Sequence, residues 1–343
     1  MKNYLHLIPM AGLCLLASSS FAQTADSPYK VLDTVKVMGT GGIDYVFADN
    51  DARRIYVPRG NQTYVFGLDD HKPMGAITNI GGHGIAIDSK SHHGFSSSSP
   101  IGMFDTETMQ KIKTIDVQGR PDGILFEPFT GRVFVFSHAA PSITMIDPKE
   151  GTVVGTIEVG GAMEQAQSDG VGKLYVAVED EKKVAVVDLK TFKLVTKYDL
   201  GTTAGEPAGL GLDAKNHLLF AMCSDPSVCV VVNAEDGKVL KTLPIGNGSD
   251  NGGFNPNTME AFSSQRDGTL TIIKEQTPTT FAVEQNVETK AGCKTCSLDS
   301  KNNRIITVCT ERAQPAAGEA PPAGGGRGGR GGPGNLDVLW VGR

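Results

Sequence analysis

Seven positions with polar or charged side chains recur along the chain at intervals of roughly 40 residues. Most are acidic, one is an imidazole and one is an amine. They are Asp44, His83, Asp122, Glu164, Glu206, Asp250 and Lys294. Carboxylate oxygens suit Ca²⁺ or Mg²⁺, and a mixture of carboxylate and histidine also accepts Zn²⁺ or Mn²⁺. Asp44, His83, Asp122 and Asp250 are therefore candidate metal ligands, and the whole set could instead bind a polar or cationic small molecule.

Some of these residues also have a purely structural interpretation. The aspartates in "GID" and "RPDG" could accept hydrogen bonds from turn amides. Lys294 could neutralise a neighbouring carboxylate, or it could bind an anionic group of a substrate or stabilise an oxyanion. The sequence leaves these alternatives open.

The sequence around each position repeats one pattern of short strands. A Gly-rich entry leads to an apolar strand, an acidic or amide turn, an aromatic strand, a loop and an apolar strand, as in "GGIDYVFADNDARRIYV" and "VFGLD". The turns are marked by Asp49, Asp88, Glu127, Ser168, Asp213, Asn255 and Asp299. Large apolar residues follow each turn, and we expect them between the sheets: Tyr56, Phe95, Phe134, Tyr175, Phe220, Phe262 and Ile306. This period predicts an all-β, seven-bladed β-propeller of four-stranded antiparallel blades.

The seventh copy lacks its fourth strand, and a matching strand lies at the other end of the chain. The segment "YKVLDTVKV", residues 29–37, is expected to complete the last blade and close the ring. The first strand of each blade then lines the central channel. The seven polar positions therefore converge on one mouth, and the apolar residues that alternate beyond them, such as Val46 and Ile85, confine charge to that mouth.

The three histidines of the segment "GGHGIAIDSKSHHGFSSSS" are predicted to lie at two different places in the blade. His83 begins a channel strand, whereas His92 and His93 follow Asp88 in a turn. At about 3.3 Å per residue, the strand carries that turn roughly 16 Å away, to the opposite face. The register therefore excludes a metal site made of all three histidines.

Several units resemble a known family of exported bacterial proteins. The segments "ARRIYV", "GKLYVAV" and "VAVVDLKTFKLV" are similar to the YVTN-repeat, or YncE-like, propellers, and the resemblance covers about Tyr29 to Arg343. It implies the propeller fold. It does not fix the function, because the family's roles include ligand binding, surface display, nucleic-acid binding and partnership with redox enzymes, and related propellers include lactonases and dehydrogenase subunits.

The N-terminal residues 1–22 are typical of a secretory signal peptide. Lys2 precedes an apolar run that is too short for a membrane span, and Ser20 and Ala22 occupy the small positions before the cleavage site. We expect a mature chain of residues 23–343, cut after Ala22, that is periplasmic or secreted and has no membrane span. Its formal net charge of −6 before cleavage argues against general nucleic-acid binding.

Five of the six cysteines lie in the predicted mature chain. Cys223 and Cys229 flank a turn, and Cys293 is almost opposite Cys309 across the "SKNN" turn, so we predict the disulfides Cys223–Cys229 and Cys293–Cys309. Cys296 is expected to be a buried thiol. A Cys293–Cys296 redox pair is an alternative, and a zinc site from the last three cysteines lacks a fourth ligand. No Cys-x-x-Cys-His motif is present, so covalent haem is not expected.

Residues 313–334, "AQPAAGEAPPAGGGRGGRGGPG", separate two strands of the last blade and contain no core-forming residue. We expect a flexible loop on the face of the mouth, either a tolerated insertion or a mobile lid.

The sequence as a whole favours a monomeric binding protein without catalysis, whose unknown partner is a small molecule or a protein at the central mouth. A divalent metal ion such as Ca²⁺ could belong to the site. Two alternatives stay open, a metal-dependent hydrolase of lactonase type and an accessory subunit of a periplasmic redox enzyme.

Overall fold

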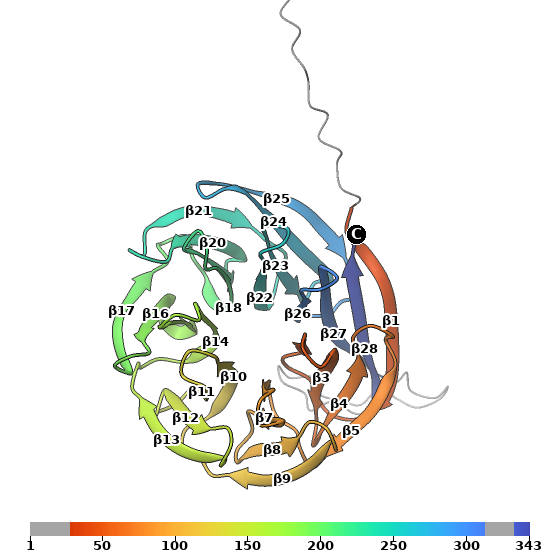
Figure 1. Ribbon diagram of the computed structural model, residues 1–343. Coiled ribbons are helices and arrows are strands. Elements are labelled where there is room, and N and C mark those ends of the chain that lie inside the picture. The colour runs from red at the N-terminus through yellow and green to blue at the C-terminus, as the bar shows by residue number, and fades with distance from the viewer. Residues whose placement is uncertain (1–27, 313–332) are drawn as a thin grey trace, which may run out of the picture.

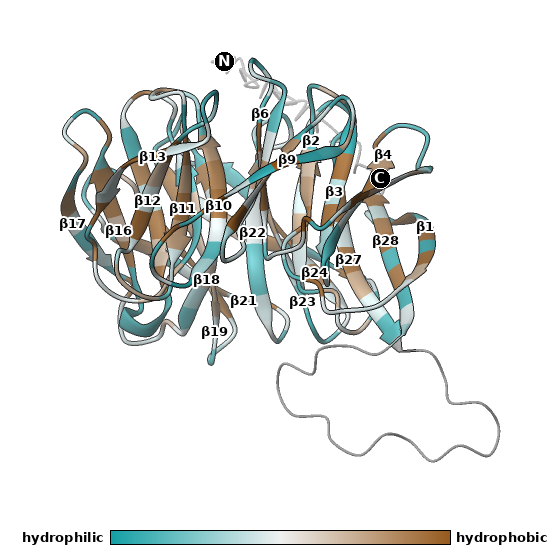
Figure 2. Ribbon diagram, turned by 90° about the horizontal axis from the view of Figure 1, so that it is seen from below, coloured by the Kyte–Doolittle hydropathy of each residue, from teal (hydrophilic) through white to brown (hydrophobic). Residues whose placement is uncertain are grey.

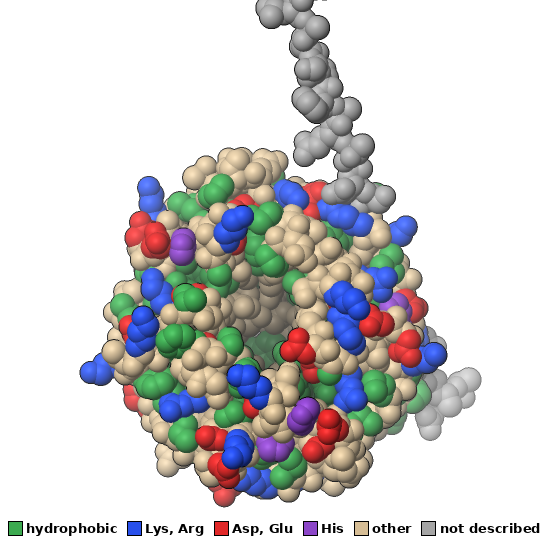
Figure 3. Space-filling view, viewed as in Figure 1, with side chains coloured by type: hydrophobic (Ala, Val, Ile, Leu, Met, Phe, Trp, Pro, Cys, Tyr) green, Lys and Arg blue, Asp and Glu red, His purple; other side chains and the backbone are tan. Residues whose placement is uncertain are grey.

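The computed structural model describes residues 28–312 and 333–343, whose strands form seven four-stranded antiparallel sheets around a central axis (Figure 1). This confirms the all-β propeller predicted from the repeats. The predicted signal peptide, residues 1–22, lies outside the described residues, and so does the predicted loop except for its last two residues. Figure 3 views one face of the ring, which is hollowed at its centre.

Six blades consist of four consecutive strands each. Blades one to three are β2 (Phe47–Asp49), β3 (Arg54–Arg59), β4 (Gln62–Gly67) and β5 (Pro73–Thr78); β6 (Ile85–Asp88), β7 (His93–Ser96), β8 (Ile101–Asp105) and β9 (Gln110–Ile115); and β10 (Pro121–Glu127), β11 (Arg132–Ser137), β12 (Ile143–Asp147) and β13 (Thr152–Ile157).

Blades four to six continue this order, with one short 3₁₀-helix in blade four, η1 (Glu179–Glu181). Their strands are β14 (Met163–Ser168), β15 (Lys173–Val178), β16 (Lys183–Asp188) and β17 (Lys193–Asp199); β18 (Glu206–Asp213), β19 (Leu218–Ser224), β20 (Val228–Asn233) and β21 (Val239–Pro244); and β22 (Ser249–Asn255), β23 (Glu260–Gln265), β24 (Thr269–Thr277) and β25 (Thr280–Glu288).

Blade seven joins the two ends of the described chain. It consists of β26 (Thr295–Asp299), β27 (Arg304–Arg312), β28 (Gly334–Gly342) and β1 (Lys30–Gly39). The strand β1 runs antiparallel to β28, with Val35 opposite Val338 (Figure 1). The predicted closing strand is therefore present, and it extends two residues beyond Val37. Pairing along its full length leaves no gap in the ring.

Two side chains of blade one fasten it to the closing strand β1 and to its partner β28. The buried Arg59 guanidinium donates to the carbonyl oxygens of Gly39 and Gly334, each at 3.1 Å. The His71 ring stacks on Trp340 with 4.2 Å between the centroids, and its Nδ1 lies 2.6 Å from an Asp33 carboxylate oxygen. Blade one thus contacts both strands that meet at the closure.

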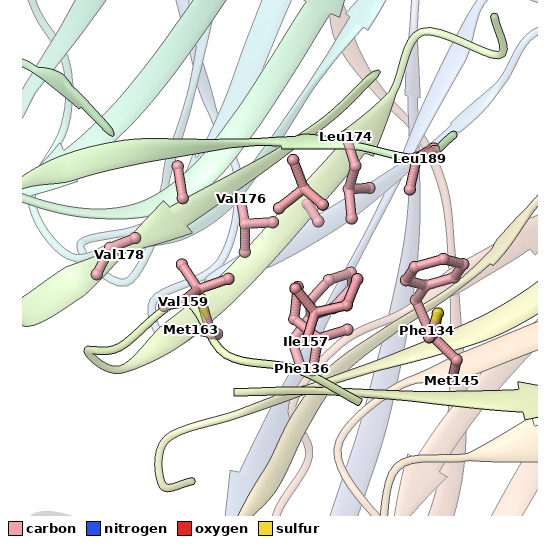
Figure 4. Close-up of a cluster of buried hydrophobic side chains, with 14 residues drawn as sticks. Phe134, Phe136, Met145, Ile157, Val159, Met163, Leu174, Val176, Val178 and Leu189 are labelled. Atoms are coloured by element: carbon pink, nitrogen blue, oxygen red, sulfur yellow. The ribbon is translucent and has the colours of Figure 1, made fainter. Parts of the chain in front are cut away.

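Apolar side chains fill the spaces between neighbouring blades. Figure 2 shows hydrophobic residues along many of the strands and hydrophilic residues in many of the loops. Phe134 and Phe136 on β11 face Leu174 and Val176 on β15 (Figure 4). The large residues predicted after each turn are all buried: Tyr56, Phe95, Phe134, Tyr175, Phe220, Phe262 and Ile306. Burial of this kind stabilises each blade only against its neighbours, so the blades depend on one another.

The turn residues predicted from the repeat have a structural role. The Asp49 carboxylate accepts hydrogen bonds from the backbone nitrogens of Asp51 and Ala52 at 3.1 and 3.0 Å. Glu127 accepts in the same way from Phe129 and Thr130, at 3.0 and 2.7 Å. Such side chains satisfy turn amides and set where the second strand begins.

Two buried carboxyl groups meet between blades five and six. Asp213 and Glu275 are 2% and 3% exposed, and one oxygen of each lacks a hydrogen-bond partner. Burial, and repulsion by Asp213, raise the pKa of Glu275 to about 7, although Asn216 donates to it at 2.7 Å. One proton shared by the pair would satisfy both unpaired oxygens.

This pair predicts that stability falls as pH rises. The pKa of Glu275 in the folded chain lies above its ordinary 4.5. The contribution of the protonated Glu275 to the free energy of unfolding is therefore fully present below pH 4.5 and is lost as pH rises through 7. Between pH 4.5 and 8, the free energy of unfolding of the wild type, measured in urea, should fall by about 1–3 kcal/mol relative to that of Glu275→Gln. Glu288→Gln, an exposed change on β25, should follow the wild type, and parallel profiles for all three proteins would contradict this account.

Candidate functional site

The first strand of every blade lines the channel, and the predicted mouth residues stand at or just before the start of these strands. Backbone hydrogen bonds join neighbouring blades at this level. Tyr45 donates to the carbonyl oxygen of His83 at 3.0 Å, and Asp250 donates to that of Lys294 at 3.3 Å. The convergence of the strands therefore fixes the spacing between side chains that are about 40 or more residues apart in sequence.

One half of the mouth contains an amine held between two carboxylates and a guanidinium that contacts one of them. Lys294 contacts Asp44 at 2.8 Å and also bonds Asp250. The Arg266 guanidinium also contacts Asp250, at 2.6 Å from Oδ2. Burial opposes the charge on Lys294, but Asp44 and Asp250 together raise the pKa of Lys294 above its ordinary value. These contacts are consistent with the first alternative for Lys294, in which its amine neutralises neighbouring carboxylates.

The other half of the mouth contains two imidazoles. His83 Nδ1 lies 2.7 Å from Asp44 Oδ2 and 2.9 Å from Asp122 Oδ1. His138 Nε2 lies 3.1 Å from Asp122 Oδ2 and 2.9 Å from Glu164 Oε1. Tyr45 donates its hydroxyl to Glu164 Oε2 at 2.6 Å. Apart from Glu206, the predicted mouth residues therefore belong to one chain of alternating positive and negative groups, and not to the mostly acidic ring expected from the sequence.

Electrostatics in this half follow from burial and pairing. The bonds to Asp122 and Asp44 raise the pKa of His83 to about 10, and those to Asp122 and Glu164 raise the pKa of His138 to about 10. Burial opposes ionisation of Asp122, but His138 and His83 hold the pKa of that carboxyl well below its usual range. Burial raises the pKa of Glu164 to about 7.

Arg120 adds a condition on the protonation of His138. Its guanidinium lies 2.8 Å from His138 Nδ1. A guanidinium only donates, so this contact requires a neutral ring with its proton on Nε2. The carboxylates favour the doubly protonated ring, and in that state the exposed Arg120 side chain has to turn away.

Several mouth residues lie outside the first strands, on which the sequence-based prediction rests. His138, Glu179 and Arg266 each come directly after the second strand of their blade, β11, β15 and β23. This regular position is the signal that could have found them. Glu179 is half-buried near the mouth, and burial raises its pKa.

The predicted residues divide by what they contact. Asp44, His83, Asp122, Glu164, Asp250 and Lys294 belong to the one chain of contacts described above. Glu206, at the start of β18, is exposed and has no side-chain hydrogen bond or ion pair to the described residues. Asp250 contacts the cations and neither imidazole, so it stands apart from the other three candidate metal ligands.

Two groups in the described part of the chain have the composition of a metal site. One is Asp44, His83 and Asp122, and the other is Asp122, His138 and Glu164, with the ligand atoms of each group within 4.8 Å of one another. His92 and His93 lie elsewhere: His92 pairs with Glu107 and His93 contacts a carbonyl oxygen across the turns.

Below the charged mouth, the channel is uncharged. A cavity of about 320 Å³ is lined by apolar and amide side chains, among them Ile85, Ile124, Gln165 and Gln167. Gln165 accepts a hydrogen bond from the Leu210 amide at 2.9 Å and so links blades four and five. The apolar alternation expected below the mouth is therefore interrupted on β14 by these glutamines.

The five cysteines of the described residues are buried and are free thiols in the structure. Cys223 is paired in register with Val228, and Cys229 with Met222, so the two thiols are diagonal neighbours. Cys293 and Cys309 lie in one small cluster, where a hydrogen bond with Cys309 lowers the pKa of Cys293. Burial raises the pKa of Cys296 to about 12, so this thiol is unreactive near neutrality. Both predicted disulfides stay predictions.

Comparison with known proteins defines the class of fold. The chain matches no family model and no curated protein. Among solved structures it is similar to U3-55K, with a TM-score of 0.69 and 11% identity over 91% of this chain and 99% of that one. It is also similar to the RRP9 WD40 repeats, with a TM-score of 0.68 and 12% identity over 92% and 100%. At such identities the likeness shows the propeller fold alone.

These comparisons do not confirm the resemblance to the YVTN-repeat family, which stays a prediction. Within the part of the chain that the structure describes, no helix is long and apolar enough to cross a membrane.

The contacts of Lys294 predict its contribution to stability. Its side chain is 15% exposed and holds two carboxylates together, so Lys294→Met removes the amine between Asp44 and Asp250 and leaves each with only its other partner, His83 or Arg266. The free energy of unfolding should fall by about 2–4 kcal/mol in denaturant titration. Lys72→Met, which removes a 78% exposed amine paired with Asp70, should cost less than about 1 kcal/mol. Equal losses for the two variants would show that the mouth is not held by this amine.

Proposed function

We propose that this propeller is a non-catalytic binding protein whose mouth takes a small polar ligand with at least one ionised group. The observation that supports this is the continuous chain from Arg266 through Asp122 to Glu164. Its charged groups are held in place by one another before any ligand arrives. A site with fixed side chains loses less conformational entropy on binding, which favours affinity.

Exposure indicates which groups a ligand would meet first. The side chains of Arg266 and His83 are 56% and 49% exposed, and those of Asp250 and Asp44 are 26% and 23% exposed. Asp122 and Glu164 are 10% and 12% exposed and lie deeper. A ligand at the rim therefore meets both a cation and a carboxylate, which is an arrangement suited to ionised polar molecules.

A thermal-shift screen of small organic acids, amino acids and amines tests this proposal. A ligand that binds the mouth should raise the melting temperature of the wild type. Asp250→Asn, which removes a rim charge, should weaken the same ligand by at least about tenfold in titration calorimetry. Glu150→Gln, an exposed acid in the turn after β12, should bind like the wild type. If every ligand found in the screen binds Asp250→Asn unchanged, the mouth is not the binding site.

A second candidate function, a metal-dependent hydrolase of lactonase type, is supported by the two histidine–carboxylate groups. A bound metal could polarise a carbonyl group and activate water there. Turnover of lactones that depends on added divalent metal and disappears in Asp122→Asn would favour this function over simple binding. An accessory role beside a periplasmic redox enzyme is tested by co-purification of a cofactor-bearing partner.

Export, the monomeric state and membership in the YVTN-repeat family remain part of this proposal. The leader pattern of residues 1–22 supports export, and N-terminal sequencing of the protein recovered from the periplasm or medium should begin at Gln23. Retention of Met1 in that fraction would contradict cleavage at this site.

A further inference from the structure

Asp122 is the centre of the imidazole half of the mouth. Its two carboxylate oxygens face different rings, Oδ1 lying 2.9 Å from His83 Nδ1 and Oδ2 lying 3.1 Å from His138 Nε2. Asp122 is buried, with 7% of the residue exposed. Its carboxylate therefore faces the two rings more than it faces water. A carboxylate presented in this way can bridge two partners at once.

The two outer carboxylates have a different arrangement. Lys294 donates to Asp44 Oδ1 at 2.8 Å, which leaves Oδ2 facing His83. Tyr45 donates to Glu164 Oε2 at 2.6 Å, which leaves Oε1 facing His138. Each outer carboxylate is therefore oriented by a donor outside the two groups. Donors of this kind orient metal-binding carboxylates in known metal sites.

We propose that the mouth binds a pair of divalent metal ions bridged by the carboxylate of Asp122. One ion takes Asp44 Oδ2, His83 Nδ1 and Asp122 Oδ1, and the other takes Asp122 Oδ2, His138 Nε2 and Glu164 Oε1. This inference shares one premise with the proposed function, which is that the central mouth is the binding site. Carboxylate-bridged ions in two-metal sites lie about 3.5–4 Å apart.

The ligand set selects the kind of ion. Each ion receives one imidazole nitrogen and two carboxylate oxygens, a mixture that suits Mn²⁺ or Zn²⁺, with water in the remaining positions. Ca²⁺ prefers six to eight oxygen ligands and is disfavoured. Each ring releases the proton that it donates to the carboxylates, and the metal takes its place.

Loading the second ion has a consequence for Arg120. When Nε2 of His138 binds a metal, the ring proton lies on Nδ1, and Nδ1 can no longer accept from the guanidinium. The exposed Arg120 side chain must leave, so Arg120→Gln should bind metal as well as the wild type or better.

Metal stoichiometry tests the inference. After treatment with a chelator and titration with Zn²⁺, the wild type should bind two ions per chain in calorimetry and in elemental analysis. His83→Ala and His138→Ala should each keep one ion, and Asp122→Asn should weaken both by more than about 100-fold. His92→Ala, which alters a histidine of the opposite face, should keep two. Circular dichroism of each variant checks that it is folded.

Two further measurements separate a bridged pair from two unrelated ions. Mn²⁺ bound to the wild type should show magnetic coupling in electron paramagnetic resonance, whereas His83→Ala should show an isolated ion. Tyr45→Phe should weaken only one of the two Zn²⁺ sites, by about 10-fold to 100-fold.

Three results would overturn the inference: a wild type that binds one ion or none, an Asp122→Asn variant that keeps two, or uncoupled Mn²⁺. These results differ from failure of the proposed function. Ligands found by thermal shift that still bind metal-free protein would leave the binding function intact while the metal pair is rejected. Conversely, two bound ions with no organic ligand from the screen would support the metal pair and reject the proposed small-molecule site.

Discussion

Closure of the ring is the constraint on which the rest of the molecule depends. Each blade buries its apolar faces only against its two neighbours, so an open ring would leave two faces exposed. The antiparallel pairing of β1 with β28 removes that opening, and Arg59 and His71 fasten blade one to the joined strands. The closed ring then sets the positions of the seven first strands. Because Asp44 precedes blade one and Lys294 precedes the first strand of blade seven, their contact exists only when the ring is closed.

The charged mouth is compatible with this compact fold because its charges alternate. Isolated ionised groups are costly to remove from water, and the cost falls when each meets an opposite partner. Asp122 lies between His83 and His138, and Lys294 lies between Asp44 and Asp250. The resulting chain is neutral over short distances although it contains many ionised groups. The alternation also explains how the mouth can be a preformed site. The residues that line the cavity beneath it, near Gln165, are uncharged.

Much of the fold follows from local patterns in the sequence. The turn acids such as Asp49 and the large residues such as Phe134 recur because each repeat has the same backbone requirements. The first-strand positions of the mouth, from Asp44 to Lys294, follow from the same register. His138 and Arg266 follow the second strands at a regular position, so the register could place them near the mouth, but their contacts depend on loop conformations that packing between blades determines. Pairing also depends on the folded structure: only the folded ring shows that Asp44, Asp122, Glu164 and Asp250 each have a cation or an imidazole beside them, whereas Glu206 has neither among the described residues.

The account assigns Asp122 the central position in the mouth, with one imidazole and one outer carboxylate on each side. Anomalous diffraction at the Mn²⁺ edge, from crystals of the wild-type protein grown with that ion, tests this assignment most directly. The account predicts two anomalous peaks about 3.5–4 Å apart, one near each oxygen of Asp122. A single peak, or peaks remote from Asp122, would contradict it.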